Sequence, residues 1–169
     1  LTSGRCTFNH RWAEILGYDL AELKPHIDSW VSLVYKDDVK DAKAQLHQQL
    51  KGEIEHFCCE IRMRHKSGDW VWVLSQGRVT ERDAAGKALR MSGTHVEITA
   101  QKKAEKELKM AASVFSHARE GILITDAKGV IVDVNETFTH LTGYSKEESI
   151  GRNPSFLKSG LQAESFYRE

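Results

Sequence analysis

The sequence contains little cysteine and little proline. Three cysteines and two prolines occur among its 169 residues. Three cysteines are too few, and odd in number, for the disulfide framework of a small secreted domain, so we expect free thiols in a reducing compartment. Cys58 and Cys59 are adjacent, and on a strand their side chains would point to opposite faces, so we expect no bond between them. The cysteine content therefore favours a cytoplasmic protein.

The sequence also lacks an excess of charge and a long apolar run. Its 24 basic side chains balance its 24 acidic ones, so no overall positive charge is present to attract nucleic acid. No run approaches the roughly eighteen apolar residues of a membrane span, and the first ten residues contain no apolar signal-peptide core. Because the chain begins with Leu1 and not with methionine, we expect a segment of a longer protein.

A repeat relates the two ends of the chain. Residues 8–23 (FNHRWAEILGYDLAEL) align with residues 134–149 (VNETFTHLTGYSKEES) at an offset of 126. In each copy an asparagine, Asn9 or Asn135, is predicted to cap a short helix that Gly-Tyr ends. The chain therefore contains two copies of one structural unit.

Different elements accompany the two copies. After the first copy, three segments with alternating or β-rich composition (53–64, 70–82 and 88–99) are joined by short turns that contain glycine. This pattern predicts an antiparallel meander. In the second copy, the segment 121–135 predicts a strand, a tight turn and another strand before the helix.

A helix is predicted between the two copies. Residues 100–118 contain no glycine or proline and are rich in residues that favour helix. Its apolar residues Ala104, Leu108, Ala111 and Phe115 recur at coiled-coil spacing. We expect this seam to support a homodimer with help from the flanking domains, because it is short and rich in alanine. The alternative is a helix that rests one face on its own domain.

Together these segments resemble the PAS domain family. The resemblance rests on ILGYDLAEL, VYKDDV, EIRMRHKSGDWVWVLSQGRVTERDAAGKALRMSGTHVEIT and, in the second copy, GILITDAKGVIVDVNETFTHLTGYSKEESIGRNP. It implies an α+β fold in which short helices flank a five-stranded antiparallel sheet, followed by a signalling helix. The expected parts are a PAS/PAC domain without its first strand (1–99), the linker helix (100–118) and the N-terminal half of a second PAS domain (119–169).

The resemblance also implies that the first sheet is incomplete. The absent first strand is central in the family and lies beside the last meander strand, while residues 5–8 would form the second strand. One interpretation is that the hairpin 121–135, or the same strand of a neighbouring chain, completes this sheet by strand addition. The other is that the sequence omits residues of the full protein.

A flavin adduct is excluded at Pro154. The segment GRNPSFLKSG resembles the flavin loop G-R-N-C-R-F-L-Q of LOV domains, but proline replaces the cysteine whose thiol adds to the flavin. Ser155 and Lys158 replace two further flavin contacts of that loop, and Asn153 alone remains. A similar loop is familiar from PAS domains that precede diguanylate cyclase and phosphodiesterase domains.

Other cofactors and catalysis are not expected. The resemblance would place a haem-ligating histidine near Asp41, and the nearest candidate, His47, lies about two turns later. His56, Cys58 and Glu60 share one strand face, but a metal would need a further ligand from elsewhere. No Gly-x-Ser-x-Gly elbow, phosphate-binding glycine loop or His-Glu-x-x-His motif is present. We therefore expect no metal site and no enzyme activity in this chain.

The resemblance leaves a ligand pocket as the candidate site. In the family, the cavity lies between the inner face of the sheet and the short helices, which implies walls formed by Trp12, Ile15, Leu16, Trp30, Val34, Phe57, Ile61 and Trp72. A filled core made of the same residues is the alternative. Glu97, Ile98 and Thr99, in a segment similar to the family's G-T-x-x-D-I-T exit, would relay a change from the last strand to the helix.

We therefore expect the input region of a bacterial cytoplasmic signalling protein. It would bind a small ligand or partner and pass a conformational change through the exit helix to an output domain in the same polypeptide. The expected output domain is a diguanylate cyclase or phosphodiesterase, with a histidine kinase as the second choice. The alternatives are a purely structural dimerisation module and, less favoured, a flavin or haem sensor.

Overall fold

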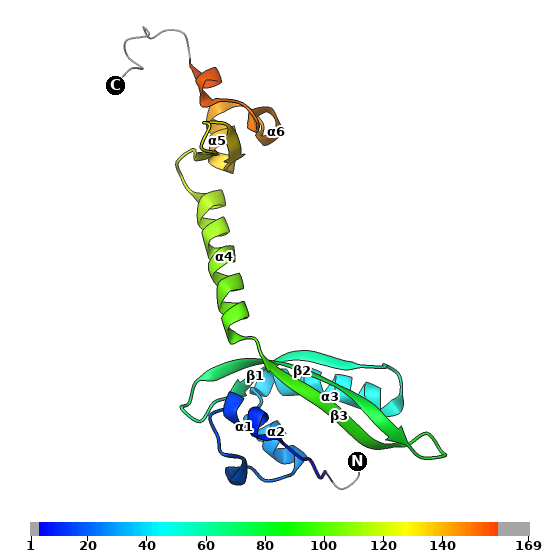
Figure 1. Ribbon diagram of the computed structural model, residues 1–169. Helices are drawn as coiled ribbons and strands as arrows, with labels where there is room; N and C mark the ends of the chain where they lie inside the picture. The colour runs from blue at the N-terminus through cyan, green and yellow to red at the C-terminus, as the bar shows by residue number, and fades with distance from the viewer. Residues whose placement is uncertain (1–3, 159–169) are drawn as a thin grey trace. The chain divides into compact units, whose positions relative to one another are not determined.

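The chain forms two compact units joined by one helix. The computed structural model describes residues 4–158 (Figure 1), and the units comprise Leu1–Ala104 and Glu105–Glu169. Helix α4 (Thr99–His117) begins in the first unit and ends in the second. None of the described helices is long and apolar enough to cross a membrane.

Four helical segments open the first unit, namely α1 (His10–Ile15), η1 (Leu20–Glu22), α2 (Ile27–Leu33) and α3 (Lys36–Lys51). The predicted asparagine cap of α1 is confirmed, because Asn9 Oδ1 accepts a hydrogen bond from the Trp12 amide at 2.8 Å. Helix α3 ends at Gly52, whose φ of 83° favours glycine. The helices are therefore bounded by ordinary cap chemistry.

The predicted antiparallel meander is confirmed. Strands β1 (Phe57–Arg64), β2 (Trp70–Arg82) and β3 (Ala88–Glu97) form one sheet in the order β1-β2-β3. The predicted start of the first strand at residue 53 is wrong, because Gln49 Nε2 donates to the Glu55 carbonyl and that carbonyl is engaged by α3. The predicted alternation holds, with Ile61 and Met63 buried and Arg64 exposed.

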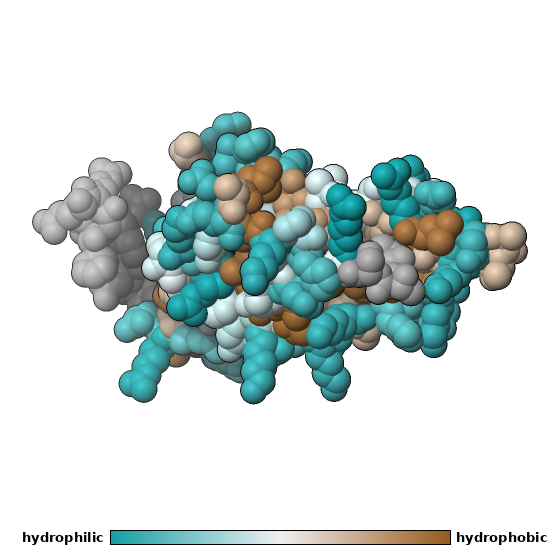
Figure 2. Space-filling view, turned by 90° about the horizontal axis from the view of Figure 1, so that it is seen from below, coloured by the Kyte–Doolittle hydropathy of each residue, from teal (hydrophilic) through white to brown (hydrophobic). Residues whose placement is uncertain are grey.

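Helices α1, α2 and α3 pack against one face of this sheet. The buried core between them contains Trp12, Leu16, Trp30, Val34, Ala42, Ile61, Met63, Val71 and Val73. Burying each large side chain of this kind contributes about 1.5–3 kcal/mol. On the surface drawn in Figure 2, by contrast, hydrophobic residues form separate patches among hydrophilic ones.

The expected α+β fold is confirmed, but the expected five-stranded sheet differs in strand count. The described residues form a three-stranded sheet and a separate two-stranded sheet. The predicted strand at residues 5–8 is reduced to an isolated bridge between Arg5 and His26.

The second unit repeats the beginning of the first. Strands β4 (Leu123–Thr125) and β5 (Ile131–Val134) form a hairpin with its own two-stranded sheet. Helices α5 (Glu136–Thr142) and α6 (Lys146–Ser149) and the turn η2 (Pro154–Leu157) follow. Asn135 caps α5 as Asn9 caps α1, and its side-chain oxygen accepts from the Phe138 amide at 2.9 Å. The predicted repeat is therefore confirmed in structure.

Gly93 should be intolerant of substitution because β2 and β3 approach closely there. A Cβ at this position would lie 2.3 Å from the Gln76 carbonyl oxygen. We expect Gly93→Ala to lower the free energy of unfolding by about 1–3 kcal/mol, the usual cost of overpacking, as measured by urea denaturation. The exposed neighbour Ser92 provides the control, since Ser92→Ala should change stability by less than about 0.5 kcal/mol. Equal stability of the two variants would contradict the close approach.

Candidate functional site

Most of the predicted pocket residues lie together in the core of the first unit. Trp12, Leu16, Trp30, Val34 and Ile61 are buried in one contiguous cluster. Ile15 packs on its border, and Phe57 is buried outside it. The structure thus brings seven of the eight candidates to the side of the sheet that the helices cover or to its border.

The eighth candidate, Trp72, lies on the opposite face of the sheet. Its neighbours Val71 and Val73 face the core, so alternation along the strand turns Trp72 outward. There its ring lies 5.4 Å from the guanidinium of Arg62, its register partner on β1. Trp72 is therefore placed to contact the exit helix and not the core.

A polar cluster that the sequence did not predict borders the core. Trp12 Nε1 donates to His95 Nδ1 at 2.5 Å, and His95 Nε2 lies 2.7 Å from Ser75 Oγ. The three residues come from α1, β2 and β3. The only signal in the sequence was that residues 93, 95 and 97 share one strand face. In the structure His95 pairs with Ser75 across the two strands, on the face that the helices cover. The cluster ties the first helix to the strand that leads out of the sheet.

The hydrogen bonds define the protonation state of His95. The indole N–H of Trp12 can only donate, so His95 Nδ1 must accept and the imidazole is neutral, with its proton on Nε2. Burial lowers the pKa of His95 from its usual 6.5 to about 4. Protonation of Nδ1 would place its N–H against the indole N–H of Trp12, so a charged His95 is incompatible with this contact.

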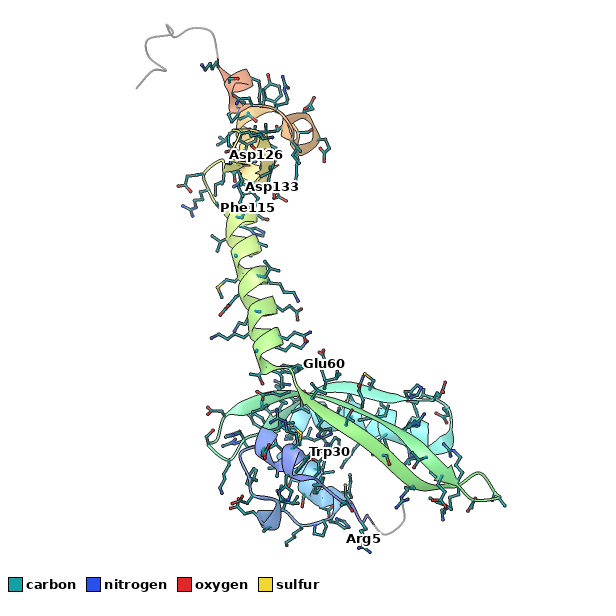
Figure 3. All side chains as sticks on the ribbon, in the orientation of Figure 1. Arg5, Trp30, Glu60, Phe115, Asp126 and Asp133 are labelled. Atoms are coloured by element: carbon teal, nitrogen blue, oxygen red, sulfur yellow. The ribbon has the colours of Figure 1, made fainter. Side chains whose placement is uncertain are left out.

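One donor in the core has no acceptor. Within residues 4–158, the indole Nε1 of Trp30 and the side-chain oxygen of Gln49 are buried without a hydrogen-bond partner. Trp30 is only 6% exposed and lies between the helices and the sheet (Figure 3). An unsatisfied buried donor costs about 1–3 kcal/mol. An acceptor atom at this point, supplied by a bound molecule, would remove that cost.

A shallow hollow lies elsewhere on the sheet. It measures about 300 Å³ and is lined by His56, Phe57, Cys58, Gln76, Gly77, Arg78, Ser92, Gly93 and Thr94. Among the described residues, no group of three or more His, Cys, Asp or Glu side chains is placed to hold a metal ion. Apart from Phe57, the hollow shares no residue with the predicted pocket.

The predicted relay residues lie where the sheet meets helix α4. The Ile98 amide donates to the Trp72 carbonyl at 2.9 Å, and Thr99 Oγ1 accepts from the Trp72 amide at 3.1 Å. Ile98 is buried, whereas Glu97 is exposed. Both backbone groups of Trp72 are therefore satisfied by the first residues beyond β3.

An ion pair that the sequence did not predict fastens the first turn of α4. Lys102 Nζ lies 2.5 Å from Glu60 Oε2 and 5.5 Å from the ring centroid of Trp72. Glu60 lies beside the start of the helix in Figure 3. A residue from β1, one from β2 and one from α4 thus meet at this junction.

A second ion pair ties α3 to β1. Arg62 donates from Nε and Nη2 to the two oxygens of Asp38, at 2.9 and 2.6 Å. The hydrogen bonds from Arg62 lower the pKa of Asp38. The bidentate pair gives this acidic helix-start residue a structural role.

The predicted seam of α4 differs in exposure from one end to the other. Ala104, Leu108 and Ala111 are exposed, and Leu108 is 72% exposed. Phe115 is half-buried, and its carbonyl accepts a hydrogen bond from Asn135 within the second unit. The first three positions therefore present an apolar strip on an exposed helix.

The loop that resembles a flavin site packs against the turn of the β4–β5 hairpin. Asn153 Nδ2 donates to the Gly129 carbonyl at 3.1 Å, and Pro154 begins the turn η2. The Phe156 ring packs edge-on against Tyr144, 4.9 Å between centroids. The loop thus has a packing role, with proline where a reactive thiol would be required.

His95 should make stability depend on pH. From about pH 6.5 down to about 4, the unfolded chain binds a proton at this residue that the folded chain does not bind. The contribution is complete above pH 6.5, and we expect a loss of about 1–3 kcal/mol as the pH falls through this window. Urea titrations across this range should show a flatter profile for His95→Gln, which cannot titrate.

The exposed His56 supplies the matched control for this experiment. His56→Gln makes the same substitution at a side chain that is largely in solvent and outside the contacts of Trp12 and Ser75 with His95. Parallel profiles for the parent and His95→Gln would show that the His95 pKa is not depressed.

Two family models match the chain in tandem. Both describe the PAS fold, one over residues 5–95 and the other over residues 109–159. No curated protein sequence matches the chain.

Solved structures of bacterial sensor domains resemble the chain. A sensory box histidine kinase/response regulator from Burkholderia thailandensis is 28% identical, with a TM-score of 0.54, and the match covers 62% of this chain and 76% of that one. The N-terminal domain of a diguanylate cyclase with PAS/PAC sensor from Marinobacter aquaeolei is 16% identical, with a TM-score of 0.53, covering 60% and 91%. The second likeness concerns the fold alone. With a PAS model matched over more than half of its length, the chain belongs to the PAS family.

Proposed function

We propose that this chain senses a small molecule in its first PAS unit and relays the bound state through α4 to an output domain. The relative at 28% identity supports a sensory signalling module. The observation that carries the proposal is the junction at Trp72. There the sheet and the exit helix share two hydrogen bonds, from Ile98 and to Thr99. A displacement of β2 or β3 is therefore transmitted directly to the first turn of α4.

The core offers a route from a ligand to that junction. Trp12 contacts His95 on β3, and His95 lies three residues before Ile98. A ligand that accepts a hydrogen bond from Trp30 Nε1 would bind beside Trp12 in the same cluster. It shifts the population of states only if it binds one arrangement of helices and sheet better than the other. The ligand class that fits is a small, largely apolar molecule with a hydrogen-bond acceptor.

Two other functions predict different properties. A purely structural dimerisation module would self-associate with a dry core, and its orphan indole N–H would be a tolerated cost. A flavin or haem sensor would absorb visible light. For flavin, Pro154 removes the cysteine that adduct chemistry requires. In none of the three does this chain act as an enzyme.

We propose that the protein is cytoplasmic and acts as a homodimer with an output domain in the same polypeptide. The seam of α4 supports the dimer, because exposed apolar side chains along a helix lose contact with water when two helices pair. The loop at residues 151–160 favours a diguanylate cyclase or phosphodiesterase output. The relative at 28% identity favours a histidine kinase.

Native mass spectrometry of the purified chain tests the sensor proposal. A bound molecule would add a defined mass, which Trp30→Phe should remove because that variant keeps an aromatic ring but loses the indole donor. The control is Trp70→Phe, on a partly exposed tryptophan. Bare polypeptide for the parent, both as purified and after incubation with cell extract, would favour the structural module.

Leu108→Glu should weaken dimerisation. A carboxylate placed in the seam must be desolvated on association, so we expect the dissociation constant to rise at least about tenfold in analytical ultracentrifugation. Ser113→Glu adds the same charge on the opposite side of α4 and should leave association unchanged. If both variants associate like the parent, the seam is not the dimer contact.

A further inference from the structure

Asn135 makes more hydrogen bonds than a helix cap requires. Its side-chain oxygen accepts from the amides of Phe138 and Ile122, at 2.9 and 2.8 Å. Its side-chain nitrogen donates to the carbonyls of Phe115 and Glu120, at 3.1 and 2.9 Å. The residue is 2% exposed. One buried amide therefore joins the end of α4, the entry to β4 and the start of α5.

One of the two donated bonds serves the end of the linker helix, and the other serves Glu120 in the segment that follows it. The last carbonyls of any helix have no partner within it, and Phe115 belongs to the last turn of α4. Thr137 contributes a further bond from the first turn of α5, since its hydroxyl donates to the Ala118 carbonyl at 2.6 Å. Side chains of the second unit thus complete the hydrogen bonding where α4 ends.

The first copy of the repeat contains the same cap. Asn9 occupies the equivalent position and accepts from Trp12 as Asn135 accepts from Phe138. Asn9 is exposed, however, whereas Asn135 is buried. The cap is common to both copies, and the bonds from the Asn135 side chain to the Phe115 and Glu120 carbonyls are additional to it.

The other end of α4 is held in the first unit. Thr99 accepts from Trp72, and Lys102 pairs with Glu60. The helix between the two attachments contains no glycine or proline to absorb a displacement. Hydrogen bonds weaken steeply when their distance or angle changes, so movement of the last turn disturbs the bonds of Asn135.

We propose that Asn135 and Thr137 form the receiving contact of the relay, which passes displacement of α4 to the hairpin β4–β5 and to α5. This inference rests on the proposed function, because it requires that the first unit displaces α4. Asn135 acts as a positioning residue. Its side-chain nitrogen binds the last turn of α4, while its side-chain oxygen caps α5.

Asn135→Asp separates these two roles. Aspartate keeps the oxygen that caps α5, but it replaces the donor with an acceptor that faces two carbonyl oxygens. We expect amide hydrogen exchange in residues 113–122 to accelerate about tenfold or more, while protection of the Phe138 amide is retained. Asn9→Asp is the matched control and should change exchange in α1 by less than about twofold.

A milder variant covers the case in which Asn135→Asp unfolds the second unit. Thr137→Val removes only the hydroxyl bond to Ala118 and should accelerate exchange in residues 113–122 by about threefold. Exchange at the parent rate in both variants would overturn the proposed contact.

A double-mutant cycle distinguishes relay from local support. Glu60→Gln breaks the ion pair at the far end of α4, and we expect it to alter exchange in residues 123–138 by at least about threefold. In the Asn135→Asp background the same change should have no further effect on that segment. If the effects of Glu60→Gln and Asn135→Asp on exchange are additive, Asn135 is a structural cap and not part of a relay. If Glu60→Gln has no effect in the parent background, the relay is refuted. If exchange at 113–122 is still fast in Asn135→Asp, the contact between Asn135 and α4 is nevertheless supported.

Discussion

The structure depends on the hydrogen bonds that join the Trp72 backbone to the residues directly after β3. The Trp72 amide donates to the Thr99 hydroxyl, and its carbonyl accepts from the Ile98 amide. Buried or half-buried backbone groups must find partners, so the chain that leaves β3 is held against β2 as it turns into α4. The Trp72 side chain faces Arg62 and Lys102 on the outer side of the sheet. Strand, exit and helix therefore form one connected unit.

The core of the first unit combines apolar packing with a few polar groups in defined states. His95 is neutral because Trp12 donates to it and burial disfavours its charged form. Trp30, in α2, leaves its indole N–H without an acceptor in the described residues. Such groups make the inner face sensitive to what lies against it. An apolar core alone would not distinguish a ligand from a side chain of the same shape.

The repeat shows how one local motif acquires two roles. Asn9 and Asn135 cap equivalent helices with the same bond. The side-chain nitrogen of Asn135 also donates to the Phe115 carbonyl in the last turn of α4 and to the Glu120 carbonyl beyond it. The cap follows from the local sequence, whereas these further bonds depend on where α4 ends.

The sequence alone determined the helix caps, the meander, the linker helix and the family, because these depend on local residue type, periodicity and short motifs. The candidate wall residues came from the resemblance to the family, and seven of the eight lie on or beside the inner face of the sheet. Trp72 was assigned to the wrong face for a pocket wall, although its neighbours Val71 and Val73 carried the alternation that places it outside. The contacts of Trp12 with His95, of Lys102 with Glu60 and of Asn135 with Phe115 were decided only by the tertiary structure. Each joins residues from different elements through a single distance and angle, and a hydrogen bond or ion pair of that kind leaves no periodic signal in the sequence.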